Sequence, residues 1–319
     1  MLDSFLYSVN IILPVLLIVA LGYILKRIGF LTKEFTDVAE KLVFKVALPV
    51  QLFLEIAQSD GISAFSGKFI IFCVCGILIL FFALCLTVPL FIKENDKRGA
   101  FIQGVYRTNF AILGIPLATS MFPEDGGTQI AVIMPFAIFL FNALAVVILS
   151  IYAPKERRLS KGQLVLKIFK STVTNSLIIG IVLALPFMIF KIQLPAFTSK
   201  ALGYLSNMTM PVSLICVGAT FSFSSLAKRM NLAISATLLK TVAVPLVAVT
   251  AAVLLGFRGS QLGVILILFG APTAVASYVM AKNMKSDYEL AGQILLLTTL
   301  ICLSTLFLFI FVLKSLGFI

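Results

Sequence analysis

The stretch NFAILGIP, Asn109 to Pro116, lies in the middle of an apolar segment that is long enough to cross a membrane. Proline inside a helix removes a backbone donor and clashes with the preceding turn, so we expect the segment from about 99 to 121 to break near Pro116. The lipid core has no water to satisfy the freed backbone groups. Irregular backbone is tolerated at this depth only inside protein or beside an aqueous cavity, so the break is a candidate site.

A second stretch, FGAPTA, repeats the glycine-x-proline spacing with Gly270 and Pro272. Upstream, ALPVQL in the first half matches TMPVSL in the second, with Pro49 corresponding to Pro211. Pro49 and Pro116 are 67 residues apart in the first half, and Pro211 and Pro272 are 61 residues apart in the second. This similar spacing predicts an internal duplication. Broken helices in corresponding halves are typical of a transporter's substrate site, and the alternative is unrelated kinks in a channel or receptor.

The composition predicts a membrane protein. The chain is 61% hydrophobic and 12% charged, against about 25% charged residues in an average soluble domain. Its mean hydropathy is +1.13. Ten apolar runs approach or exceed the roughly 20 residues that cross a bilayer as a helix. They lie at about 5–25, 38–58, 69–92, 99–121, 128–152, 174–190, 201–225, 231–256, 260–281 and 290–313.

The net charge of +12 is spread over the loops between these runs, which argues against nucleic acid as a partner. With an external N-terminus, 17 of the 25 Lys and Arg residues fall on the cytoplasmic side and 5 on the other. The positive-inside rule then predicts extracytoplasmic termini and a cytoplasmic KERRLSKG loop in a plasma-membrane protein. We expect five-helix units over 1–153 and 174–319, inverted relative to each other and joined by a cytoplasmic linker, 154–173.

The residues that carry most catalytic and metal chemistry are scarce. The chain has no histidine, and its five cysteines all lie inside apolar runs, where we interpret them as packing residues. No phosphate-binding loop of the GxxxxGK[ST] kind is present. We therefore expect neither a metal nor another cofactor, and no enzymatic activity.

The chain resembles the auxin efflux carrier family of membrane transporters over nearly its whole length, and looks like a bacterial, malate or malonate permease-like member. The motifs that carry the resemblance are LGYILKRIGFLT, LPVQLF, NFAILGIPL and APTAVASYVMAKNM. The resemblance implies an all-α fold of ten transmembrane helices in two inverted five-helix repeats. Their broken helices 4 and 9 would cross, as in sodium/proton antiporters and bile acid transporters. The absence of a long central insertion distinguishes the chain from the plant exporters.

Helices that start after the two breaks would present unpaired amides and partial positive charge to one anion. Proline in the first turn is a usual opening for such a helix. We expect these starts at Pro116, Leu117 and Ala118 in one half, and at Pro272, Thr273 and Ala274 in the other.

Polar side chains near the breaks are further candidates. The family resemblance implies that Asn109 contacts substrate, although membrane amides also hydrogen-bond between helices. Ser277 lies four residues after Thr273 and shares its helix face, either to line the cavity or to permit close packing. Asn142 in the fifth span is a weaker candidate.

Charged residues inside spans are costly and are functional candidates by default. Lys240 lies deep in the eighth span, where it would face the bound anion or extend its ammonium to the cytoplasmic surface. Glu55 lies near the outer end of the second span and is the candidate for proton coupling. We interpret Arg107 and Lys45 as snorkelling residues near the cytoplasmic ends of their spans.

These features favour a secondary carrier for small organic anions, which are carboxylates such as malate, malonate or auxin-like acids. It would work by alternating access, of the rocking or elevator kind. A sodium- or proton-coupled cation exchanger and a receptor that binds a ligand without moving it are the alternatives. The coupling ion stays open between H⁺, Na⁺ and none, and the assembly between monomer and homodimer.

Overall fold

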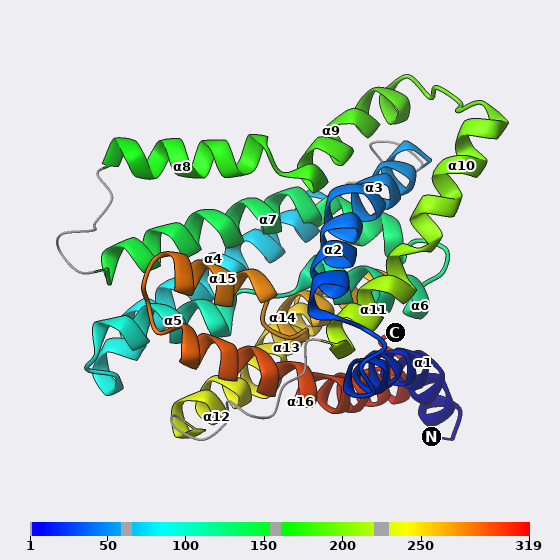
Figure 1. Cartoon of the computed structure of the whole chain (residues 1–319). Helices are drawn as coiled ribbons and strands as arrows, with labels where there is room; N and C mark the ends of the chain where they lie inside the picture. The colour runs from blue at the N-terminus through cyan, green and yellow to red at the C-terminus, as the bar shows by residue number, and fades with distance from the viewer. Residues whose placement is uncertain (1, 59–65, 154–160, 220–229) are drawn as a thin grey trace.

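The computed structural model describes residues 2–58, 66–153, 161–219 and 230–319, which form helices joined by short turns (Figure 1). Within these ranges the only β-type pairing is one isolated bridge. Six helices are long and apolar enough to cross a membrane, as expected for an all-helical, multi-pass membrane protein. Four of the six are single helices: α1 (Leu2–Arg27), α4 (Gly67–Phe91), α7 (Gly126–Ile151) and α16 (Tyr288–Ser315).

The other two long helices are built from shorter pieces. α10 (Ala196–Asn207) leads into α11 (Thr209–Ala219). α12 (Met230–Leu238) continues through the π-helical segment η6 (Leu239–Ala243) into α13 (Val244–Leu254). The remaining apolar runs form α2 (Lys33–Leu42), η1 (Val43–Ala47), α3 (Leu48–Ala57), α5 (Asn95–Tyr106), η3 (Phe110–Gly114), α6 (Ile115–Met121), α9 (Ser176–Ile189), α14 (Gly259–Gly270) and α15 (Val275–Asn283).

The predicted linker, 154–173, includes a further helix. α8 (Lys161–Val173) packs against α7 and runs beside it in Figure 1. Residues 154–160, which carry most of the KERRLSKG loop, lie outside the described residues.

In three spans a π-helical segment precedes a proline, with one residue between them. Pro49, Pro116 and Pro245 each stand two residues after η1, η3 and η6 respectively. Proline offers no N–H to the carbonyl four residues earlier, and its ring crowds that carbonyl. A wider π turn accommodates both effects without ending the helix. These prolines therefore distort their helices but do not interrupt them.

The position of the first break differs from our expectation for this reason. Phe110 to Met121 is a continuous helical stretch that includes Pro116. The interruption lies at Arg107 to Asn109, where α5 has ended and the backbone is extended at Arg107 (ψ 129°). The second break is where we expected it, because α14 ends at Gly270 and Pro272 stands in the gap before α15.

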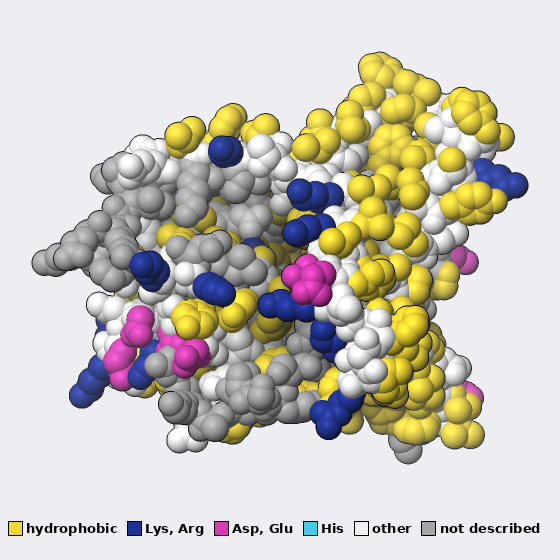
Figure 2. Space-filling model, in the orientation of Figure 1, with side chains coloured by type: hydrophobic (Ala, Val, Ile, Leu, Met, Phe, Trp, Pro, Cys, Tyr) yellow, Lys and Arg dark blue, Asp and Glu magenta, His cyan; other side chains and the backbone are white. Residues whose placement is uncertain are grey.

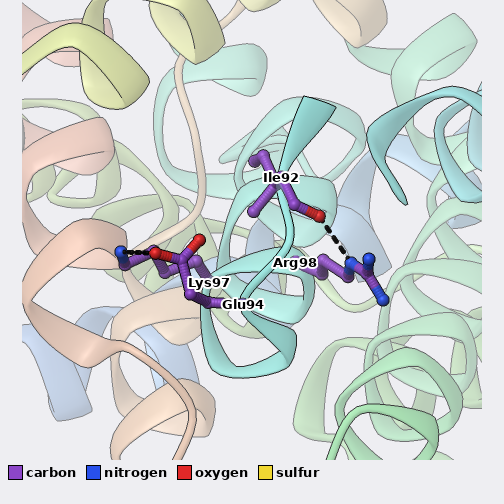
Figure 3. A network of polar contacts seen from close by, with 4 residues as sticks. All are labelled: Ile92, Glu94, Lys97 and Arg98. Carbon is purple, nitrogen blue, oxygen red and sulfur yellow. Dashed lines mark hydrogen bonds and ion pairs between the residues drawn. The ribbon is translucent and has the colours of Figure 1, made fainter. Parts of the chain in front are cut away.

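The turn before α5 fixes the start of the first broken helix (Figure 3). The Arg98 guanidinium donates from Nε to the Ile92 carbonyl at 2.7 Å, so it satisfies a carbonyl just beyond the end of α4. Lys97 and Glu94 form an ion pair at 2.7 Å across the first turn of α5. Together these contacts hold the reversal of the chain from which α5 runs towards the first break.

The two halves of the chain exchange packing partners. α1 packs against α11, and α9 packs against α3. Glycines allow the close approach, because a side chain at Gly218 would overlap the Val19 carbonyl and one at Gly180 would overlap the Pro49 carbonyl. In the same way α5 packs against α16, and α14 packs against α7. Helices of the first half thus complete the packing of the second, and the reverse.

Candidate functional site

The two interrupted helices meet at their breaks. Thr108 and Thr273 form the antiparallel bridge, and the backbone N–H of Asn109 donates to the Pro272 carbonyl at 2.7 Å. Two non-helical segments far apart in the sequence therefore satisfy part of each other's backbone. This pairing matters in a bilayer, because no water is present in the lipid core to hydrogen-bond an unpaired backbone group.

Two threonine hydroxyls brace the crossing in a reciprocal way. Pro272 cannot donate to the carbonyl four residues before it, which belongs to Leu268, and the Thr108 hydroxyl donates to that carbonyl instead at 2.8 Å. The Thr273 hydroxyl donates to the carbonyl of Gly104, which lies four residues before Thr108. Each break thus satisfies a last-turn carbonyl of the other broken helix.

A cavity of about 920 Å³ lies against this crossing. Both helix starts line it: Asn109 to Ile112 after the first break, and Ala274 to Ala276 after the second. α7 contributes Ile138, Phe141 and Asn142. Two helix starts therefore line one cavity, but they lie at Phe110 and Val275 and not at the two prolines that we expected. Pro272 and Thr273 are absent from the lining. Pro116, Leu117 and Ala118 are buried and are absent from the lining.

The outer part of the cavity is polar and charged. Its lining residues there come from α2, η1 and the start of α9, and they are Asp37, Glu40, Lys41, Phe44, Lys45, Thr174, Asn175, Ser176 and Leu177. In Figure 2, basic side chains (dark blue) gather with acidic ones (magenta) in the middle of the face that carries α2. Lys45, which belongs to η1 between α2 and α3, is exposed.

Arg107 is a candidate site residue that we did not expect from the sequence, where we interpreted it as a snorkelling residue. Its side chain is only 5% exposed and lines the inner part of the cavity at the first break. The guanidinium donates to Asn142 Oδ1 and to Met280 Sδ, both at 2.8 Å. No carboxylate in the described residues forms a salt bridge with it. Arg107 is thus a buried cation with neutral partners. Its position well inside the predicted span 99–121 was the sequence signal that could have identified it.

Lys240 lies at the crossing but outside the cavity lining. Its side chain is fully buried, and its ammonium donates to the Thr108 hydroxyl. It does not reach the surface, so it is not a snorkelling lysine. Lys240 belongs to η6, the π-helical segment just before Pro245.

Two further predicted residues, Ser277 and Glu55, are absent from the cavity lining. Ser277 is fully buried in α15, and its backbone carbonyl accepts from Gln103 Nε2 at 2.9 Å, which ties α5 to α15. Glu55 lies beside Gly127 in the first turn of α7, where a side chain would overlap its carboxylate. A helix N-terminus is a favourable environment for a carboxylate.

Comparison with known proteins identifies the class. A family model described as "Membrane transport protein" matches residues 7–310. The chain therefore belongs to this family, the membrane transport and auxin efflux carrier family, as its motifs indicated.

Two curated relatives are archaeal. An uncharacterized transporter of Methanocaldococcus jannaschii is 27% identical over 297 residues, which cover 91% of this chain and 94% of the relative. An uncharacterized transporter of Methanothermobacter thermautotrophicus is 24% identical over 307 residues, which cover 95% and 97%. The family and both relatives are transporters, a class that generally catalyses no reaction, and the chain is a multi-pass membrane transporter.

Proposed function

We propose that this transporter is a carrier for small organic anions and that the cavity at the crossing binds the carboxylate. The observation that carries the proposal is Arg107, a buried guanidinium whose hydrogen-bond partners Asn142 and Met280 are neutral and which lines a cavity that two helix starts also line. A carboxylate would pair with the guanidinium through two parallel hydrogen bonds. The helix starts would add amide donors and partial positive charge.

Asn109 and Asn142 supply neutral hydrogen-bonding groups to the same cavity. In this proposal Asn142 holds one edge of the guanidinium in the empty carrier, and Asn109 contacts the substrate. The crossing residues Pro272, Thr273 and Ala274 shape the site through the backbone. The described lining of the cavity holds three cations, Lys41, Lys45 and Arg107, against two carboxylates, Asp37 and Glu40, and Arg107 is the one of these that lies at the crossing. The charge of the site therefore favours an anion over a cation.

We further propose that the chain forms ten spans in two inverted five-helix units, 1–153 and 174–319. The exchange of partners supports this arrangement, since α1 with α11 corresponds to α9 with α3, and α5 with α16 corresponds to α14 with α7. The reciprocal threonine bonds have the same symmetry. Alternating access would then move one group of helices against the other around the crossing.

The proposed orientation makes the cavity open to the cytoplasm. Its outer lining comes from α2 and from the start of α9, next to loops that the positive-inside rule assigns to the cytoplasmic side. Both termini would be extracytoplasmic in the cell membrane. Glu55, on the opposite side near the start of α7, is our candidate for coupling transport to protons.

Transport in liposomes tests the proposed function. Purified protein would be reconstituted and supplied with labelled malate, malonate or indole-3-acetate, under imposed proton gradients, sodium gradients or neither. We expect uptake of at least one carboxylate above that of protein-free liposomes, with competition by the unlabelled acid. Saturable binding of these acids without any flux would favour a receptor, and uptake of a cation without any carboxylate would favour an exchanger.

A further inference from the structure

The ammonium of Lys240 is the most deeply buried charge at the crossing. Its side chain has no exposed surface, and the residue lies near the middle of the composite helix α12–η6–α13. The described residues place no carboxylate within salt-bridge distance of it. A charge inside a membrane protein is expensive and is expected to face a partner or a functional site.

The partner of this ammonium is a hydroxyl at the crossing. Lys240 donates to Thr108, and the Thr108 hydroxyl donates onward to the Leu268 carbonyl in the last turn of α14. The last turn of a helix carries unpaired carbonyls and partial negative charge. The α5 end lies at the same crossing, where the Gly104 carbonyl accepts from Thr273. The positive charge of Lys240 is therefore directed at a place where two helix ends supply negative partial charge.

Secondary carriers with broken helices commonly fill such a place with a coupling ion. Unwound carbonyls and the C-terminal ends of half-helices coordinate Na⁺ or H⁺ there. In this chain the described charged side chains at the crossing are Arg107 and Lys240, and both are cations. A sodium ion would meet repulsion from both and would have no carboxylate there to hold it.

We propose that the Lys240 ammonium is the built-in cation of the crossing and takes the place of a bound sodium ion. The inference rests on the proposed carrier function and adds to it the prediction that anion transport needs no Na⁺. Lys240 acts as a positioning residue. It holds the Thr108 hydroxyl, and through Thr108 it holds the end of α14. Thr108 lies between Arg107 and Asn109, which line the cavity. Its charge also favours an anion in that cavity.

The first test is thermal unfolding of the purified full-length protein, which does not depend on transport. At constant ionic strength, NaCl would be exchanged for N-methyl-D-glucamine chloride. We expect the wild-type Tm to be the same in both salts. A saturable increase of Tm with Na⁺ would overturn the proposal, because it would reveal a sodium site that Lys240 does not replace.

Variants at Lys240 provide the second test. Lys240→Ala should lower Tm by several degrees, and n-propylammonium should restore it saturably, whereas n-propanol at equal concentration should not. Lys240→Met fills the volume without the charge and should remain defective, while Lys240→Arg should retain part of the wild-type behaviour. Lys200→Ala, which removes an exposed lysine of α10, is the matched control and should behave like wild type.

Flux then separates this inference from the proposed function. Wild-type liposomes should take up the transported carboxylate equally with and without Na⁺, and Lys240→Met should lose at least about tenfold in uptake. Uptake that requires Na⁺, or Lys240→Met activity equal to wild type, would overturn the role of Lys240 and leave the anion carrier standing. If no carboxylate moves under any condition, the proposed function fails, and the Tm measurements still decide whether Lys240 substitutes for a cation.

Discussion

A single side chain, Arg107, determines most of the chemistry that we assign to the cavity. Its neighbours Asn142 and Met280 are neutral, so the guanidinium carries an uncompensated charge in a buried setting. Hydrogen bonds to charged groups typically contribute about 1.5–3 kcal/mol each. The anion is therefore expected to gain much of its affinity from this one residue.

The variant Arg107→Gln tests this assignment. It removes the charge and orphans no carboxylate in the described residues, so we expect the protein to remain folded with a Tm close to wild type. Carboxylate binding should weaken by about 1.5–3 kcal/mol, which is roughly 10- to 150-fold. Arg258→Gln, at an exposed arginine outside the cavity lining, is the control. Equal losses of affinity in the two variants, or none in Arg107→Gln, would remove Arg107 from the site.

At the scale of the helix, proline has two different effects in this chain. Pro116 lies inside a continuous helix behind a π turn, whereas Pro272 lies in a true break. The sequence could predict that both helices are disturbed, because proline always withdraws a donor. It could not predict which disturbance becomes a break, since that depends on a partner for the freed carbonyl. Thr108 supplies that partner to Leu268 from the other half of the chain.

Replacement of the two prolines should therefore have unequal effects. In Pro272→Ala the new N–H can bond to the Leu268 carbonyl, which would extend α14 and displace the Thr108 hydroxyl. We expect carboxylate uptake to fall at least about tenfold while the protein stays inserted. Pro116→Ala should let η3 relax towards an α-helix, with a higher Tm and a smaller loss of uptake. Matched losses of uptake in the two variants would instead favour equivalent roles for both prolines.

For the whole molecule, the sequence was informative about class and much less so about contacts. Hydropathy located helix in all ten apolar runs, and the motifs indicated the transporter family that the family model then confirmed. The exchange of partners between halves was not predictable, because close contacts such as Gly218 with Val19 join residues about two hundred positions apart. Arg107 was misread for the same reason. Its depth was counted along one helix, while its burial comes from α7 and α15.

The cavity, its orientation and its ligand can be examined together at Ala276, an exposed residue of the cavity lining on α15. Reporter cysteines for the two membrane faces are placed at Lys93 and Glu124, which are exposed in the turns before α5 and α7. Gly126, two residues further on, is unsuitable for a reporter because a side chain there would overlap the Ala118 carbonyl. The background variant would lack Cys75 and Cys85, the native cysteines that are not buried.

The most direct test of the central claim is the rate at which Ala276→Cys reacts with an impermeant maleimide, with and without the transported carboxylate. In the empty carrier we expect reaction only from the face that labels Lys93→Cys, and we expect the carboxylate to slow it without slowing labelling at Lys93→Cys. Reaction only from the face that labels Glu124→Cys would reverse the orientation. A rate that a transported carboxylate leaves unchanged at saturation would contradict the claim that this cavity is where the anion binds.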